Sequence, residues 1–227
     1  MASEGEASVP VPDSTESSDP TPLTAVADPT PPPPEPPKPL NLNNLPLNPI
    51  LSDTIVTSYE GERAPLHPDG PEDGPTVMSG TGTATFTGGN TYTGTFLNGM
   101  MHGSGTYTFA SSGITYEGTV EYNVLSGRGT FQWANGDVYD GEVKDGMRHG
   151  IGIFTSNGGA VYEGEWVAGV REGEGTLFYG GGRLPTDPHF KGSFVGNRRE
   201  GEGTLRYESG NEYCGSWVSD RKEGKVS

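Results

Sequence analysis

The 227-residue sequence is poor in cysteine, in basic residues and in hydrophobic residues. Its one cysteine, Cys214, excludes an intramolecular disulfide and is typical of a reducing compartment. Only 30% of the residues are hydrophobic, which is too few for a large conventional core. No apolar run approaches the ~20 residues of a membrane-spanning helix. Residues 1–6 have neither a basic start nor an apolar run, so we expect no signal peptide and a soluble, cytoplasmic protein.

The charge is strongly acidic, with 14 lysines and arginines against 30 aspartates and glutamates and a net charge of −16. Residues 1–79 carry a net charge of −11 and residues 80–227 a net charge of −5. Neither part has the basic face that binds a nucleic-acid backbone, so nucleic acid is excluded as a partner. Anionic membrane surfaces are disfavoured for the same reason.

The N-terminal part has a different composition from the rest. Residues 1–49 contain 14 of the 20 prolines together with many acidic and hydroxyl residues, so residues 1–54 are predicted to be a disordered, acidic tail. Pro29–Pro39 favours polyproline II, either as a stiff spacer or as a ligand for an aromatic groove. Residues 40–54 are richer in leucine and isoleucine. They either lie against the rest of the chain or form a docking motif for a partner.

A block of the form Tyr-x-Gly-x-(Val, Phe or Trp), a short turn and Gly-x-Gly recurs through the rest of the chain. Its starts are Tyr92, Tyr116, Tyr139, Tyr162, Phe190 and Tyr213, at steps of 24, 23, 23, 28 and 23 residues. A fixed period of this length indicates a repeat array, which typically binds or scaffolds. Residues 55–91 read as a degenerate first repeat with an insertion, and residues 92–227 as the array. The last repeat stops at Gly224, before a returning strand.

Within each repeat the pattern alternates with a period of two. In the segment Tyr139–Val143, the tyrosine, glycine and valine share one face while the two acids take the other. Pairs such as Asn98-Gly99 and Asp145-Gly146 mark tight turns. Each repeat is therefore predicted to be a β-hairpin. The fold class is all-β, an elongated meander of stacked antiparallel hairpins without helices.

Glycine and aromatic residues stand at fixed positions of the repeat. Glycine in a strand marks a close approach of other groups, so we expect rings to lie over glycine Cα atoms. The tyrosines would form one ladder and the residues four positions later, including Val120 and Val143, a second row. The predicted structural glycines are Gly94, Gly103, Gly105, Gly118, Gly127, Gly129, Gly141, Gly150, Gly152, Gly164, Gly173, Gly175, Gly192, Gly201, Gly203 and Gly215.

These residues resemble the MORN (membrane occupation and recognition nexus) repeat, Y-x-G-x-[WF]-x-x-G-x-x-x-G-x-G-x-[YF]. The segment Tyr162–Leu177 matches it closely, with leucine at the last aromatic place. The resemblance covers about residues 80–227 and implies a rod-like twisted β-sheet with a groove and a scaffold role. Short chains built mostly of these repeats resemble the radial spoke head components of cilia and flagella.

Residues with catalytic or metal-binding chemistry do not form a recognisable constellation. No Gly-Lys-(Ser/Thr) follows a glycine run, which excludes a phosphate loop. His102 and His149 share a tolerant polar repeat position and have no paired ligand, and Cys214 has no following histidine to act as its base. The acids on the outer strand face, such as Asp140 and Glu142, are interpreted as a solvated face. We expect no enzyme activity, cofactor or metal.

The function predicted from these observations is a non-enzymatic scaffold of the cytoskeleton, in the axoneme of a cilium or flagellum. Its partners would be radial spoke head subunits, with self-association or β-edge pairing at the C-terminal end near Tyr213–Val218. The alternative is a membrane-contact or phosphoinositide-linked adaptor. The candidate partner-binding aromatic groove consists of Tyr92, Phe96, Tyr116, Tyr139, Tyr162, Trp166, Phe190, Phe194, Tyr213 and Trp217.

Overall fold

The computed structural model describes residues 55–223. The predictions for residues 1–54, including the polyproline and docking segments, lie outside the described residues.

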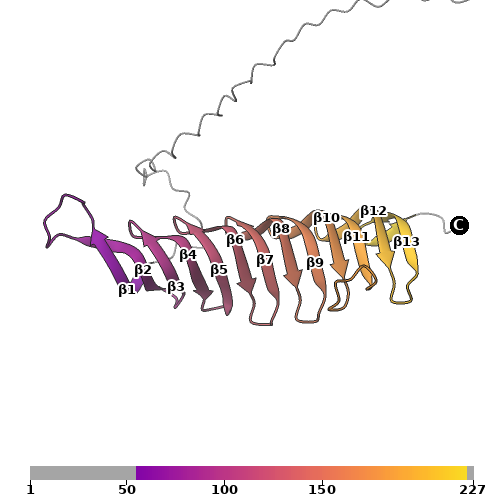
Figure 1. Ribbon diagram of the computed structural model, residues 1–227, viewed down its shortest axis with the longest axis horizontal. Helices are drawn as coiled ribbons and strands as arrows, with labels where there is room; N and C mark the ends of the chain where they lie inside the picture. Colours follow the sequence, from indigo (N-terminus) through magenta and orange to yellow (C-terminus); the bar gives the residue numbers. More distant parts are fainter. Residues whose placement is uncertain (1–54, 224–227) are drawn as a thin grey trace, which may run out of the picture. The chain divides into compact units, whose positions relative to one another are not determined.

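The described residues form one 14-stranded antiparallel sheet in which spatial order follows chain order from β1 to β14 (Figure 1). Every connection therefore joins neighbouring strands, and the predicted all-β meander of hairpins is confirmed. The strands are β1 (Val56–Pro65), β2 (Thr76–Phe86), β3 (Thr91–Leu97), β4 (Met100–Phe109), β5 (Ile114–Glu121), β6 (Val124–Gln132), β7 (Val138–Lys144), β8 (Met147–Thr155), β9 (Val161–Val167), β10 (Val170–Phe178), β11 (His189–Val195), β12 (Arg198–Arg206), β13 (Glu212–Val218) and β14 (Arg221–Glu223).

Two-residue turns with positive φ at both positions close the hairpins. Asn98 and Gly99 have φ of 51° and 83°, and Asp145 and Gly146 have φ of 52° and 73°. This geometry is that of a type I′ turn, whose twist matches the twist of the flanking strands. Asparagine, aspartate and glycine accept it with little strain, which explains why these residues recur at the turn.

A continuous line of glycines crosses the sheet. Gly129 pairs with Gly118 on one side and with Gly141 on the other, and the same glycine-to-glycine register joins every neighbouring pair from β1 to β13. The second strand of each hairpin is called the returning strand. Between the glycine line and the two-residue turn, it has more residues than the first strand with which it pairs. Gly192 to Phe194 spans two steps, whereas the paired Arg199 to Gly203 spans four. The sheet bends where the glycines and these bulges coincide.

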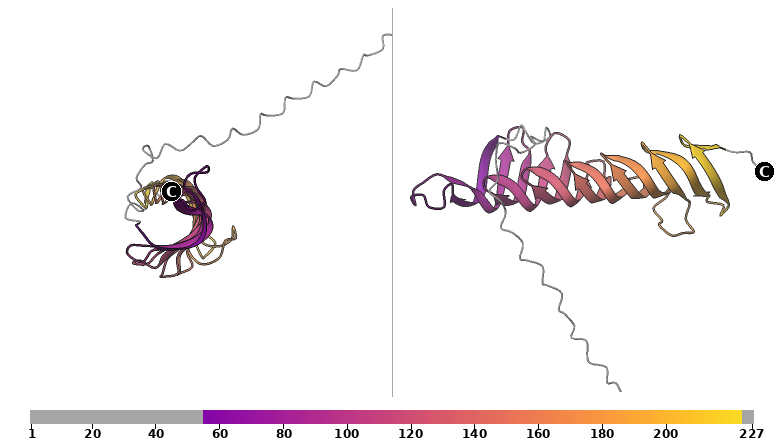
Figure 2. Two further views of the ribbon diagram at one scale, coloured as in Figure 1. Left: turned by 90° about the vertical axis from the view of Figure 1, so that its left-hand side faces the viewer. Right: turned by 90° about the horizontal axis from the view of Figure 1, so that it is seen from above.

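The bend curls the sheet about its long axis. Viewed end-on, the strands of residues 55–223 describe an open C, and viewed from above they form a long row (Figure 2). A flat single sheet would leave both of its faces exposed to water. The curl brings the side chains of the inner face into contact with one another. The inner face therefore carries the core, which contains Tyr92, Tyr116, Val120 and Tyr139 at 0% exposure.

Tyrosine rings occupy the space that the glycines leave. The ring of Tyr116 lies on Gly129 of the neighbouring strand and its hydroxyl also contacts Gly118, so a Cβ at either position would collide with it. The hydroxyl donates to the backbone oxygen of Thr119 at 2.8 Å, and that of Tyr139 donates to the backbone oxygen of Glu142 at 2.7 Å. These acceptors lie at the bulge, so tyrosine fills the bend and satisfies a carbonyl there.

The two predicted aromatic rows interlock into one zigzag. Tyr162 meets Trp166 of its own strand at 5.2 Å and 90°, and Phe194 of the next repeat at 5.1 Å and 84°. The same edge-to-face contacts continue to Phe190, Trp217 and Tyr213. Separate stacked ladders do not form, because the edge-to-face arrangement places positive ring edges on negative ring faces.

The C-terminal hairpin differs from the prediction. Ser219 and Asp220 have φ of 48° and 70°, and this turn reverses the chain so that β14 pairs with the end of β13. Trp217 and Val218, predicted to lie on an open edge, are therefore paired with Lys222 and Arg221.

Candidate functional site

The aromatic residues predicted to line a partner-binding groove are mostly interior. All of them except Tyr213 are at most 4% exposed, and Tyr213 is half-buried. Because these rings are packed into the core, little of their surface is open to a partner, although Tyr162 and Trp166 line part of a hollow on the inner face. Their burial corrects the expectation that all of these rings line an open groove, whereas their shared position on the inner face is what the alternation implied. Partner binding by these residues stays a prediction.

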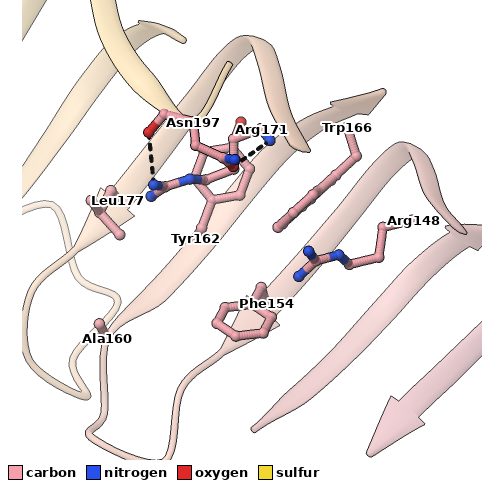
Figure 3. A pocket seen from close by; sticks show the side chains of 8 residues that line it. All are labelled: Arg148, Phe154, Ala160, Tyr162, Trp166, Arg171, Leu177 and Asn197. Carbon is pink, nitrogen blue, oxygen red and sulfur yellow. Dashed lines mark hydrogen bonds between the residues drawn. The ribbon is translucent and has the colours of Figure 1, made fainter. Parts of the chain in front are cut away.

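Two neighbouring hollows form the inner surface of the middle repeats. The first has a volume of about 280 Å³ and is lined by Arg148, Phe154, Tyr162, Trp166, Arg171 and Asn197, among others (Figure 3). The second, of about 290 Å³, is lined by Phe109, Ile114, Phe131, Trp133 and Met147 and shares Arg148 with the first. An apolar hollow thus continues into one that carries two arginines.

The arginines belong to a row at one structural position, the second residue of each returning strand. From β4 to β14 this position is occupied by Met101, Leu125, Arg148, Arg171, Arg199 and Lys222. The row is apolar at its N-terminal end and cationic at its C-terminal end.

Each cationic side chain of the row stacks on the aromatic zigzag. The guanidinium carbon of Arg148 lies 4.3 Å from the centroid of Trp166, and that of Arg171 lies 5.3 Å from the centroid of Phe194. Arg199 lies 4.3 Å from the centroid of Trp217. Such cation–π contacts are worth about 0.5–2 kcal/mol each and hold the planar groups against the inner face.

Arg148 and Arg171 lack a carboxylate partner among residues 55–223, where the ion-paired arginines are Arg128, Arg183, Arg199 and Arg206. Arg148 donates to the backbone oxygen of Gly169 at 2.6 Å, and Arg171 donates to that of Asn197 at 2.8 Å. Burial lowers the pKa of both guanidinium groups below the ordinary value, and the positive charge of Arg171 adds to the lowering at Arg148. These two cations therefore stand in surroundings that disfavour charge.

Arg199, one repeat further on, is neutralised within the chain. Its Nε donates to Oδ1 of Asp220 at 3.0 Å, and its Nη1 donates to the hydroxyl of Tyr179 at 3.2 Å. Partial burial raises the pKa of the Asp220 carboxyl group, but hydrogen bonds from the backbone and side chain of Arg199, together with the positive charges of Arg199 and Arg171, outweigh it and hold the pKa below its ordinary value.

The predicted structural glycines fall into two groups with different geometry. Gly103, Gly127, Gly150, Gly173 and Gly201 have φ between 53° and 86°, at the bulge of the returning strand. The others lie on the glycine line, where neighbouring rings or backbone approach within van der Waals distance.

Comparison with known families gives a direct result. The model described as "MORN repeat" matches residues 92–114, 116–138, 139–161, 162–183, 190–212 and 213–225. The chain belongs to the MORN-repeat family. MORN repeats are structural and binding repeats rather than enzymes, and membership indicates a repeat-based scaffold that binds proteins or associates with membranes.

Curated sequences and solved structures give two further comparisons. No curated protein sequence shows significant similarity to the chain. Among solved structures, the TCP domain of SAS-4 from Drosophila melanogaster, in complex with a proline-rich motif of Ana2, is similar with a TM-score of 0.33 and 12% identity. The alignment covers 60% of this chain and 83% of that chain.

The histidine, cysteine and acidic side chains of the MORN array are the remaining candidates for chemistry. Within residues 55–223, no three His, Cys, Asp or Glu side chains gather where a metal ion could be held. The ring of His102 contacts that of Tyr122 at a tilt of 36°, with centroids 4.5 Å apart, and Cys214 is exposed. Asp140 and Glu142 are exposed on the outer face. The part of the chain that the structure describes contains no helix with the length and hydrophobicity of a membrane span.

Sequence reasoning missed the arginine row. The signal was present, because each of these residues directly follows the first residue of a returning strand, and Arg148 has the same parity along β8 as the inward-facing Gly152 and Phe154. On alternation alone, Arg148 belongs to the inner face.

Proposed function

We propose that this MORN-repeat chain is a non-enzymatic scaffold that holds a segment of another protein in the groove of its curled sheet. The observation that carries the proposal is the pair of joined hollows on the inner face, lined by Trp133, Met147, Arg148 and Arg171. Below them lies a core of interlocked rings, so the surface is rigid and prearranged. A rigid site costs less entropy to occupy than one that must order on binding.

We further propose that the assembly is an axonemal one, the radial spoke head of a cilium or flagellum, within the cytoskeleton. The support is the architecture. The repeats cover most of the described residues from Tyr92 onward. Chains made mostly of MORN repeats resemble spoke head components.

The second candidate is an adaptor that binds phosphoinositide headgroups. The observation that favours it is the presence of half-buried Arg148 and Arg171 without a carboxylate partner. Two features oppose it. The arginines lie on the inner face of a sheet that curls around them, and the outer face is acidic at positions such as Asp140 and Glu142. A flat anionic bilayer would meet the acids first.

Affinity capture from ciliated cells tests the proposal. Tagged full chain is incubated with a salt extract of axonemes, and the bound proteins are identified by mass spectrometry. Enrichment of spoke head subunits over tag alone is the expected result. Recovery of lipid kinases or membrane proteins without axonemal partners would overturn the axonemal assignment, and salt-sensitive sedimentation with phosphoinositide vesicles would favour the adaptor.

A further inference from the structure

Arg148 and Arg171 have most of their hydrogen-bonding capacity unused. A guanidinium group has five N–H donors. Within residues 55–223 the side chains of Arg148 and Arg171 each make one hydrogen bond, to a backbone carbonyl at 2.6 Å and 2.8 Å. Both side chains are half-buried, and their planes are fixed against aromatic rings. The remaining donors are therefore held in place without a charged acceptor.

The distribution of acids explains why, within residues 55–223, neither Arg148 nor Arg171 has a carboxylate at ion-pair distance. Carboxylates of the middle repeats, such as Asp140, Glu142 and Glu165, alternate with the core residues and are exposed on the outer face. Asp220 pairs with the C-terminal neighbour Arg199 at 3.0 Å, and its charge reaches Arg171 only from beyond ion-pair distance. The groove is thus locally cationic in a chain whose net charge is −16.

The surface next to the arginine pair is apolar. Trp133, Phe109 and Ile114 are half-buried around the second hollow, and Met147 at its edge is 41% exposed. Arg148 lies on the border of both hollows, so the change from apolar to cationic occurs within one repeat. A ligand that fills both hollows needs apolar groups at one end and anionic groups at the other.

We propose that the inner groove binds an acidic segment of a partner protein. Its carboxylates receive hydrogen bonds from Arg148 and Arg171, and its apolar side chains enter the hollow beside Trp133 and Met147. Carboxylates suit the site because a guanidinium fork matches their two oxygens. The inference rests on the proposed function and adds the chemistry and polarity of the partner.

The shape of the groove favours a protein segment over a membrane. The sheet curls into an open C (Figure 2), and Arg148 and Arg171 lie beside Trp166 and Tyr162 in the first hollow (Figure 3). The apolar hollow shares Arg148 with it. A peptide is narrow enough to enter the curl and carries carboxylates and apolar side chains together. A bilayer presents its headgroups on a broad plane that the acidic outer face repels.

Fluorescence anisotropy with a defined probe tests the proposal. The probe is a labelled peptide of about 12 residues, enough to cross several strands when extended, with Phe and Leu in one half and Glu in the other. Companion peptides replace every Glu by Gln or by Lys. The full chain is expected to bind the Glu peptide at least about tenfold more tightly than either companion, because buried charge pairs dominate such contacts.

The decisive variant is Arg148→Met with Arg171→Met. Methionine occupies the same position of β4, at Met101, where it is 1% exposed, so it suits this packing environment. Arg128→Met is the matched control, because Arg128 has a side chain 79% exposed and pairs with Asp140. The double variant is expected to lose at least about tenfold in affinity for the Glu peptide, and the control less than about twofold. If the double variant does not fold, the single variants Arg148→Met and Arg171→Met replace it in the test. Each is expected to lose part of the affinity for the Glu peptide.

The proposal is overturned if the folded variants bind the Glu peptide as tightly as the natural chain, or if the Gln peptide binds equally well. Arginine-dependent binding to vesicles that contain phosphatidylinositol bisphosphate, with no binding of the Glu peptide, would also overturn it. Capture from axonemes distinguishes a failure of the arginine site from a failure of the proposed scaffold function. Equal recovery of partners by the natural chain and the double variant leaves the scaffold function intact and removes only the arginine site.

Discussion

The ring of Tyr116 lies on the backbone of Gly129, so that a Cβ added to the glycine would stand 2.6 Å from both Cζ and the hydroxyl oxygen of the ring. Real Cβ atoms do not approach other atoms this closely. The ring is itself 0% exposed and is packed against Phe131, with centroids 4.8 Å apart. It has no free volume into which it can retreat.

Replacing Gly129 by valine should therefore destabilise the sheet. We expect the free energy of unfolding to fall by about 1–3 kcal/mol, the usual cost of overpacking, measured by urea unfolding followed by circular dichroism. Gly158→Ala is the control, because its nearest heavy atom is 3.8 Å away and its φ is not positive. The control should change stability by less than about 0.5 kcal/mol. Equal unfolding midpoints for Gly129→Val and the natural chain would refute the packing of rings on glycines.

The tyrosine hydroxyl should contribute to the free energy of unfolding separately from the packing of the ring. Tyr139→Phe removes the hydrogen bond of 2.7 Å to the backbone oxygen of Glu142 and should cost about 1 kcal/mol. Phe190 occupies the same repeat position without a hydroxyl, so Phe190→Tyr should regain a bond to the carbonyl of Ser193 and raise the unfolding midpoint. Opposite shifts in the two variants support the assignment, and no shift in either contradicts it.

High pH should destabilise the array. Burial raises the pKa of Tyr116, Tyr139 and Tyr162 to about 12, whereas an unfolded tyrosine titrates near its ordinary value of about 10. The folded state therefore holds these protons more tightly. The resulting stability is complete below pH about 10 and is lost as the pH rises toward 12.

Urea unfolding at a series of pH values between 8 and 11 measures this loss. The Tyr139→Phe variant is the control, since it has one fewer buried hydroxyl to titrate. Its stability should fall less steeply with pH than that of the natural chain. Parallel curves for the two proteins would exclude the buried Tyr139 as a source of the effect.

Asn197 should link neighbouring repeats through Arg171. Its Oδ1 accepts the backbone N–H of Arg171 at 2.8 Å, and its own φ is 71°. Asn197→Ala loses the hydrogen bond and strains the turn, at a combined cost of about 1–3 kcal/mol. Asn197→Gly loses only the bond. Hydrogen exchange at the Arg171 amide should be faster in both variants, and global stability should fall further in the alanine variant. Unchanged exchange at that amide would contradict the link.

Local features of this fold could be predicted from the sequence because they follow from short-range rules. The alternation in Tyr139–Val143 and the Asp145-Gly146 pair define a strand and its turn without reference to the rest of the chain. The recurrence of glycine at fixed positions indicated that other groups approach the backbone there.

The surface of the site could not be predicted in the same way. Trp166 has the same pattern whether it lines a groove or closes a core, because alternation fixes only the side of the sheet. Its exposure of 3% depends on the curl of the whole sheet, which is a property of many strands together. The rings that contact Arg148 come from strands β8 and β9 and from the loop after β6, and no local pattern shows that they converge.

The repeat of two strands gives the groove a fixed unit of length. Neighbouring strands are about 4.8 Å apart, so equivalent residues such as Arg148 and Arg171 recur about every 9.6 Å. A polyproline II chain advances about 9.3 Å in three residues, whereas an α-helix covers about 9.6 Å in a non-integral 6.4 residues. An extended partner can therefore keep every third side chain in step with successive repeats. The number of repeats therefore sets the length of extended partner chain that the groove can hold in register. Each repeat added or removed changes that length by three residues.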